Sequence, residues 1–163
     1  MVNDHTASLP SFPAMIRVSA GEDRFDEHRG LGISAIAFKV VPQDSSGLLV
    51  IENTFHKPGG PARHLHYEQD EFFYCIDGEF TFEVGHETTH LKPGDCLLAR
   101  RQVPHVWAST GETAGKILIS FTPAGMMEAF FREVTKANAM PPQDAELWHR
   151  HGMALLGPPL TLP

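Results

Sequence analysis

The stretch PGGPARHLHYEQDEFFYCIDG, residues 58–78, decides the fold and the chemistry that we predict for this chain. His64 and His66 stand two residues apart, so on a strand both side chains point to the same side of the sheet. Glu71 then opens a run, EFFYCI, that ends at Asp77 and Gly78, a strong signal for a hairpin turn. We therefore expect two imidazoles and a carboxylate to face one point from neighbouring strands.

A second stretch, residues 93–109 (PGDCLLARRQVPHVWAS), supplies another histidine, His105. Three imidazoles and one carboxylate suit a mononuclear site for a divalent ion. The predicted metal ligands are His64, His66, Glu71 and His105, with one ion per chain. Iron, manganese, nickel, copper, cobalt and zinc all accept this ligand set. Glu71 has an alternative role as a free general base beside a three-histidine metal, so it is also the predicted catalytic residue.

The order and spacing of these residues resemble the two sequence motifs of the cupin superfamily. The matching positions are His64, His66, Glu71 and Gly78 in the first motif, and Gly94, Asp95, Pro104 and His105 in the second. The chain looks like small single-domain bacterial cupins related to quercetin dioxygenases. This resemblance implies an all-β fold, a double-stranded β-helix or jelly-roll barrel of the RmlC-like kind, with one or two C-terminal α-helices.

Length and composition favour one ordinary globular domain over residues 1–163, with 42% hydrophobic and 20% charged residues. The net charge of −7, with no basic cluster larger than Arg100-Arg101, argues against a nucleic-acid partner. No apolar run reaches membrane-spanning length and no secretory signal is visible, so we expect a cytoplasmic protein. Cys75 and Cys96 are then expected to be reduced thiols that serve as small core residues.

The chain is expected to divide into an N-terminal arm (1–15), a barrel (33–122), a helical segment (123–152) and an apolar tail (153–163). A short strand is predicted at residues 15–18. Thr122 is the predicted N-cap and Pro123 the first residue of a helix whose apolar face lies against the outside of the barrel. A second helix is predicted at 144–151. The arm and the tail both require a surface to cover, which favours a homodimer.

Strand alternation predicts an aromatic cavity beside the metal. Its inward sets are Glu71, Phe73 and Cys75; Phe80, Phe82 and Val84; and His105, Trp107 and Ser109. Such a cavity suits a small, largely apolar molecule that carries one or two oxygens. The alternative is that these rings simply fill the interior of the barrel. His56, just before the first motif, is a candidate outer group of the site, whereas His149 and His151 fall in a predicted helix and face different ways.

Three functions follow from these residues and from the resemblance. The resemblance favours a metal-dependent oxidoreductase of the dioxygenase type, acting on a small oxygen-bearing aromatic or enol substrate. The second hypothesis is a metal-dependent isomerase or lyase, in which the ion polarises a carbonyl and a side chain moves a proton. The third is a small-molecule-binding protein without catalytic activity.

Overall fold

The computed structural model describes residues 13–162. One β-sheet contains β1 (Arg29–Gly30), β2 (Ser34–Val40), β3 (Leu49–Phe55), β5 (Asp70–Asp77), β8 (Cys96–Ala99) and β10 (Gly115–Thr122). The other contains β4 (Ala62–His66), β6 (Phe80–Val84), β7 (Glu87–Leu91), β9 (His105–Ser109) and β11 (Met153–Pro159). Two short helices follow β10, namely α1 (Met127–Val134) and α2 (Ala145–Arg150).

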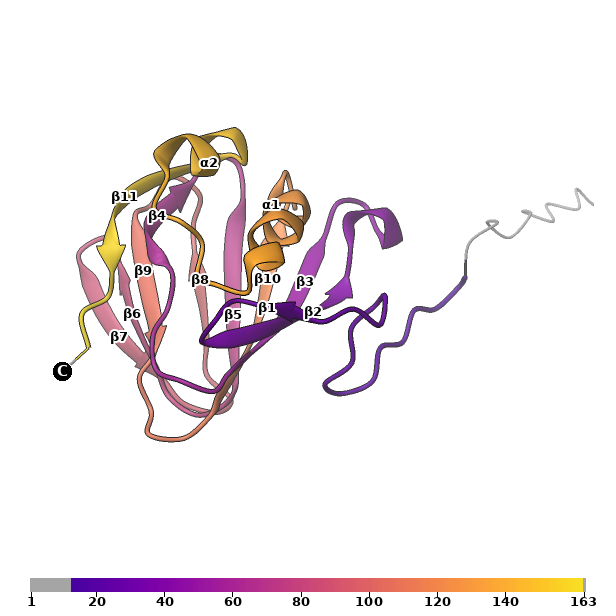
Figure 1. The fold of residues 1–163 in the computed structure, drawn as a ribbon, viewed down its shortest axis with the longest axis horizontal. Helices are drawn as coiled ribbons and strands as arrows, with labels where there is room; N and C mark the ends of the chain where they lie inside the picture. The colour runs from indigo at the N-terminus through magenta and orange to yellow at the C-terminus, as the bar shows by residue number, and fades with distance from the viewer. Residues whose placement is uncertain (1–12, 163) are drawn as a thin grey trace, which may run out of the picture.

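The two sheets face each other and enclose the core, with α1 and α2 at the same end of the molecule (Figure 1). Their strand orders are β1-β2-β3-β10-β5-β8 and β11-β4-β9-β6-β7. Successive strands cross between the sheets, so β4 and β5 are consecutive in sequence but belong to different sheets. This winding is the predicted double-stranded β-helix with two C-terminal helices, and it confirms the all-β fold class.

Turn residues in the sequence set where the strands end. Gly78 follows β5 with a φ of 79°, and a Cβ there would lie 2.8 Å from the Cα of Gly115. Only glycine fits both this backbone conformation and this close approach. Gly94 has a φ of 96°, and the amide of Asp95 donates to the carbonyl of Lys92 over 2.9 Å, which closes a turn through Pro93 and Gly94.

The core is rich in aromatic side chains that alternate along the strands. Phe73 on β5 and Phe80 and Phe82 on β6 are fully buried, and the ring centroids of Phe73 and Phe82 are 4.8 Å apart. Edge-to-face pairs of this kind stabilise a core beyond the area that they bury. The predicted inward positions of β5 and β6 are therefore confirmed for these phenylalanines, while Val84 is half-buried.

Two local predictions were wrong. Residues 15–18 form no strand, because the first sheet ends at β1 and offers these residues no partner. Thr122 does not cap a helix, because it pairs with Asp70 as the last residue of β10. A turn through residues 123–126 follows, and α1 begins at Met127. Residues 1–12, which hold most of the predicted arm, lie outside the described part of the chain.

The second predicted helix, by contrast, is present. The Asp144 side chain accepts hydrogen bonds from the amides of Glu146 and Leu147 at the start of α2, and Gly152, with a φ of 82°, follows it. The predicted tail contains β11, which pairs antiparallel with β4 and so lies beside His64 and His66 in the sheet.

A buried ion pair attaches the loop before β1 to the first sheet. Arg29 and Asp23 are in contact, with side chains that are 4% and 5% exposed. Asp23 also accepts hydrogen bonds from the amides of Phe25 and Phe38, each over 2.8 Å. The Arg29 guanidinium lies 4.1 Å from the ring centre of Phe38. Burial opposes ionisation, but these donors outweigh it and lower the pKa of Asp23.

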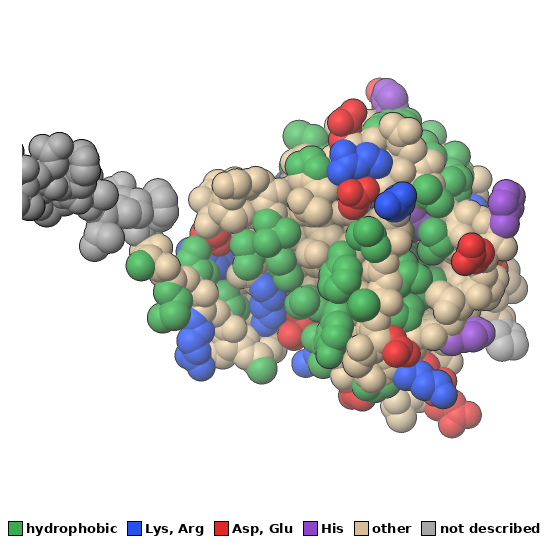
Figure 2. Space-filling view, turned by 180° about the vertical axis from the view of Figure 1, so that it is seen from behind, with side chains coloured by type: hydrophobic (Ala, Val, Ile, Leu, Met, Phe, Trp, Pro, Cys, Tyr) green, Lys and Arg blue, Asp and Glu red, His purple; other side chains and the backbone are tan. Residues whose placement is uncertain are grey.

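Charges elsewhere on the surface are dispersed. Figure 2 shows basic side chains scattered over one face, several of them next to acidic ones, and hydrophobic side chains gathered near its middle. Exposed large hydrophobic residues include Tyr74 and Ile76 on β5 and Leu98 on β8. Among residues 13–162, no helix reaches the length and hydrophobicity that crossing a bilayer requires.

Candidate metal centre

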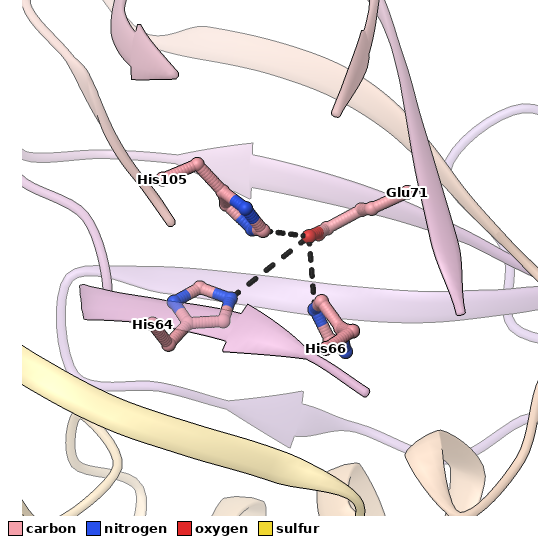
Figure 3. Close-up of side chains that lie close together, drawn as sticks. All are labelled: His64, His66, Glu71 and His105. Atoms are coloured by element: carbon pink, nitrogen blue, oxygen red, sulfur yellow. Dashed lines mark hydrogen bonds and ion pairs between the residues drawn. The ribbon is translucent and has the colours of Figure 1, made fainter. Parts of the chain in front are cut away.

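Four side chains from three strands converge inside the barrel, as Figure 3 shows. His64 and His66 project from β4, Glu71 from β5 and His105 from β9. β4 and β9 are paired with His64 opposite His105, while Glu71 reaches across from the other sheet. The structure therefore brings together all four of the predicted ligands.

The Glu71 carboxylate lies at the centre of the cluster. Its Oε2 atom is 3.0 Å from His105 Nε2, 3.1 Å from His66 Nε2 and 3.9 Å from His64 Nε2. The four potential ligand atoms all lie within 4.8 Å of one another, and all four residues are buried. Glu68 is exposed and Asp70 pairs with Arg101, so the nearby acids do not compete with Glu71 for this position.

Backbone carbonyls orient two of the imidazoles. His64 Nδ1 donates to the carbonyl of Ala62 over 2.7 Å, and His105 Nδ1 donates to the carbonyl of Val103 over 3.0 Å. A carbonyl oxygen only accepts, so each Nδ1 carries the proton and a neutral ring then has its lone pair on Nε2. Both Nε2 atoms face Glu71: a protonated ring donates to the carboxylate there, and a neutral ring directs its lone pair there. A divalent cation shared with the carboxylate satisfies this arrangement, so the residues fit a metal site.

The electrostatics of the cluster follow from burial and from Glu71. Burial, together with neighbouring His105 and His66, holds the pKa of His64 well below its usual range. Burial also opposes ionisation of Glu71, but the hydrogen bonds from His105 and His66 outweigh it and hold the pKa of Glu71 below its usual range. The same contact with Glu71 overcomes burial at His105 and raises the pKa of that ring. The site thus favours an ionised carboxylate and a neutral His64, as metal binding requires, whereas His105 must release its proton when a metal binds.

A cavity of about 50 Å³ adjoins the cluster, bordered by His64, His66 and Glu71. Most of its remaining lining is apolar and aromatic. Phe130 and Trp148 come from the two helices, and Phe121 comes from the end of β10. The cavity is large enough for a few water molecules or a small organic ligand.

The cavity is aromatic as predicted, but most of its rings differ from those expected. Trp107 lines it, whereas Phe73, Phe80 and Phe82 pack inside the barrel, as the alternative interpretation held. The first predicted helix, α1, does have an apolar face. This face covers the cavity, whereas the sequence predicted only that it lies against the outside of the barrel. Met127 and Phe130 of α1 are both buried there. Alternation along the sequence predicts the face of the sheet to which each side chain points, but it does not predict which end of the barrel a helix covers.

Other predicted residues lie away from the centre. His56 is exposed, and its ring nitrogen contacts the carbonyl of Gly32. His149 is exposed as well, whereas His151 is buried and donates from Nδ1 to the carbonyl of Leu147. Cys75 is buried, but Cys96 is exposed, so its predicted core position was wrong. Cys96 belongs to β8, the last strand of its sheet, and the open edge leaves that position uncovered.

Sequence reasoning missed Ser34 on β2 and Asn53 on β3, two buried polar residues that line the cavity. Each is a polar residue at an inward position of a strand whose other inward residues are apolar. The alternation of β2 and β3 could therefore have identified both as buried polar residues. Trp148, also missed, looked like an ordinary helical core residue. It became visible as a wall of the site only once α2 was placed over the barrel.

Replacing Glu71 with glutamine separates its two proposed roles. A ligand at the centre of the cluster loses its charge in this variant, so we expect divalent-metal affinity to fall by at least about 100-fold. Loss of a mere outer partner of a metal ligand already costs roughly 10- to 100-fold. Glu68→Gln, an exposed neighbour, is the matched control and should bind like the wild type. Unchanged affinity in Glu71→Gln, measured by competition with a chromophoric chelator, would make Glu71 a free base.

A match to a protein-family model supports the assignment of the fold. Residues 54–121 match the model of the cupin domain. Structural neighbours include KdgF from Halomonas sp. (21% identity, 55% of this chain and 77% of that chain covered, TM-score 0.49). They also include an oxalate decarboxylase variant from B. subtilis (16% identity, 58% and 26% covered, TM-score 0.50). A third is an uncharacterised protein with a double-stranded β-helix domain from Klebsiella pneumoniae (22% identity, 67% and 84% covered, TM-score 0.48).

The comparison with curated proteins found no match. The structural likeness is distant in sequence and concerns the fold alone. The matched region begins in β3 and ends in β10, so it contains the whole four-residue cluster. The cupin-domain match over residues 54–121 and the double-stranded β-helix topology agree, and together they support the cupin superfamily.

Proposed function

We propose that this protein is a metal-dependent enzyme, an oxidoreductase of the dioxygenase type that acts on a small enol- or hydroxyl-bearing substrate. One observation carries the proposal: three imidazole Nε2 atoms and a carboxylate converge on a buried point at the wall of an apolar cavity. A ligand set that serves only structure needs no adjoining cavity, whereas a reacting molecule must reach the metal.

Each ligand residue has a defined task in this proposal. His64, His66 and His105 would hold the ion through Nε2, with the carbonyls of Ala62 and Val103 fixing the rings of His64 and His105. Three neutral imidazoles and one carboxylate leave a divalent ion with one net positive charge. When bound, that ion supplies electrophilic stabilisation of an ionised substrate oxygen and, if redox-active, a route for electrons to O₂.

The aromatic walls have a separate task, which is to keep water out. Phe121, Phe130 and Trp148 are each at most 3% exposed and border the cavity. A dry cavity strengthens the interaction between a cation and a substrate anion and protects reactive species from hydrolysis. Glu71, at the same wall, is positioned to take the proton of a substrate hydroxyl if it leaves the metal.

The size of the cavity supports a small substrate. Its volume of about 50 Å³ is far below the roughly 300–1,000 Å³ of pockets that hold drug-sized ligands. A flavonoid would require α1 or α2 to move away from the barrel. We therefore propose a substrate of only a few non-hydrogen atoms. The resemblance to quercetin dioxygenases enters the proposal only through the type of reaction, not through the substrate.

Glu71 also favours one alternative function. A carboxylate at the cavity wall beside a Lewis acid is the arrangement used to move a proton next to a carbonyl, as in a metal-dependent isomerase or lyase. No oxidant takes part in that chemistry. The presence or absence of an O₂ requirement therefore separates the two functions.

Oxygen consumption tests the proposal. Protein reconstituted separately with Fe²⁺, Mn²⁺, Ni²⁺ and Co²⁺ is assayed with a panel of small enols, hydroxyketones and diketones in an oxygen-electrode cell. We expect at least one metal and substrate pair to consume O₂ in proportion to protein, with none consumed by a His105→Ala variant. Turnover that persists without O₂ would favour the isomerase or lyase. Ligand binding without turnover under either condition would point to a binding protein.

A further inference from the structure

Besides His66 Nδ1 at the metal centre, three residues that line the cavity each have a buried polar atom with no hydrogen-bond partner among the described residues. The buried atoms concerned are Ser34 Oγ, Asn53 Oδ1 and Trp107 Nε1. All three residues line the cavity and are at most 5% exposed. A buried polar atom without a partner costs about 1–3 kcal/mol, so atoms of this kind call for a ligand or ordered water.

Strand register places Ser34 and Asn53 on the same face of the first sheet, and Trp107 reaches toward them from β9 in the other sheet. Ser34 pairs with Phe55 across β2 and β3, and Asn53, two residues before Phe55, faces the same way. The Phe55 ring also contacts the Trp107 ring, with centroids 5.7 Å apart. Phe55 thus lies next to all three residues, which we call the polar triplet.

The polar triplet lies a short distance from the metal centre. Trp107 follows His105 by two residues on β9, and both face inward, so their Cα atoms are about 7 Å apart. Figure 3 shows His105 at the cluster. One small molecule can therefore touch the metal with one end and the polar triplet with the other.

The hydrogen-bonding groups of the polar triplet define which chemical group the bound molecule must carry at the end away from the metal. The Trp107 N–H only donates, the Asn53 Oδ1 only accepts and the Ser34 hydroxyl does both, so the matching group must also donate and accept. No lysine or arginine lines the cavity within residues 13–162. A carboxylate or phosphate at that end would therefore lack a counter-charge, and burying it would be costly.

We infer that Ser34, Asn53 and Trp107 form a specificity site for an uncharged hydroxyl or carboxamide group of the substrate, whose other end carries the metal-binding oxygen. This inference rests on the proposed function, because the metal centre provides the second anchor. It narrows the substrate class to short bifunctional molecules with one neutral polar end.

Matched hydroxamate probes test this inference on the full chain loaded with Co²⁺. The pairs are 2-hydroxyacetohydroxamate with propanohydroxamate, and 3-hydroxypropanohydroxamate with butanohydroxamate, which differ only by hydroxyl against methyl. We expect one hydroxyl probe to bind about 10-fold more tightly than its methyl partner, the effect of one or two net hydrogen bonds. A carboxylate-ended probe, succinic monohydroxamate, should bind more weakly than both. Binding is read from the Co²⁺ absorption spectrum and from calorimetry.

Substitutions in the polar triplet test whether it causes the tighter binding of the hydroxyl probe. Asn53→Leu and Trp107→Phe, which keep approximate volume and remove the polar atoms, should reduce the hydroxyl preference to about 1 while the methyl probe binds as before. Ser34→Ala should reduce it partially. Ser109→Ala is the matched control, because Ser109 is also buried but does not line the cavity. Thermal denaturation of each variant shows that it folds, and any one folded triplet variant suffices for the comparison.

The outcomes separate this inference from the proposed function. If Co²⁺ binds and hydroxyl and methyl probes bind alike in the wild type, the polar triplet holds only water and the inference is overturned while the metal centre stands. A preference that survives in all three triplet variants overturns it as well. If Co²⁺ does not bind at all, the proposed function fails and the inference falls with it.

Discussion

Replacing His64 and His66 together with alanine is expected to abolish metal binding. The wild type, after removal of metals and incubation with Co²⁺ or Zn²⁺, should hold about one ion per chain, and the double variant less than about one-tenth of that. Two of the four convergent ligand atoms are removed. The remaining Glu71 and His105 come from different sheets, and no third ligand group lies beside them among residues 13–162. Elemental analysis after desalting measures the ratio directly.

Two controls make this result specific. His86→Ala/His90→Ala removes two exposed histidines, one in the β6–β7 turn and one on β7, and should keep the full metal content. Because a ligand that binds only the folded state stabilises it, Co²⁺ should also raise the Tm of the wild type and of this control, but not that of the His64→Ala/His66→Ala variant. A wild type that stays metal-free after reconstitution, or a double variant that still holds one ion, would refute the assignment.

Breaking the buried pair between Asp23 and Arg29 is expected to cause the largest loss of stability outside the metal centre. Asp23→Asn leaves the nearly inaccessible Arg29 guanidinium without its buried counter-charge, although the exposed Glu27 still contacts it. Removing one partner of a buried pair costs roughly 3–5 kcal/mol, and the remaining contact places our expectation near the lower value, about 3 kcal/mol. Urea denaturation monitored by tryptophan fluorescence gives the free energy of unfolding.

The control for this variant is Asp26→Asn, an exposed acid in the same loop, for which we expect a change within about 0.5 kcal/mol. The sign of the pH dependence is a further check. The pKa of Asp23 is lowered in the folded state, so its stabilising effect is present above the unfolded value near 3.8 and is lost as pH falls through the lowered folded value. The difference between wild type and Asp23→Asn should therefore shrink below pH 4. A constant difference would show that the cost is steric rather than electrostatic.

Sequence reasoning found the cluster of three histidines and Glu71 because these residues lie at fixed places on strands. Residues two apart on a strand share a face, which sets His64 beside His66 whatever the rest of the chain does. The turns at Gly78 and Gly94 are equally local, since each depends on a backbone conformation that favours glycine. The inward positions of Glu71 and Phe73 follow from the same alternation.

The errors arose where a position depends on a distant segment. Thr122 has the chemistry of an N-cap, but its pairing with Asp70 keeps it in β10. Cys96 looked like a core residue, and only the position of β8 at the edge of its sheet exposes it. Local propensity is a weak guide in both cases, because long-range pairing outweighs it.

The sequence by itself determined the candidate metal-ligand set and the β-rich architecture, since both depend on spacing, alternation and turn residues within short stretches. Only the tertiary structure decided what surrounds the candidate metal centre. Phe130 and Trp148 border the cavity because α1 and α2 cover one end of the barrel, and Asn53 lies there because β3 pairs with β2 and β10. The composition of such a cavity is fixed by the packing of segments far apart in the chain, and no periodicity within one segment encodes that packing.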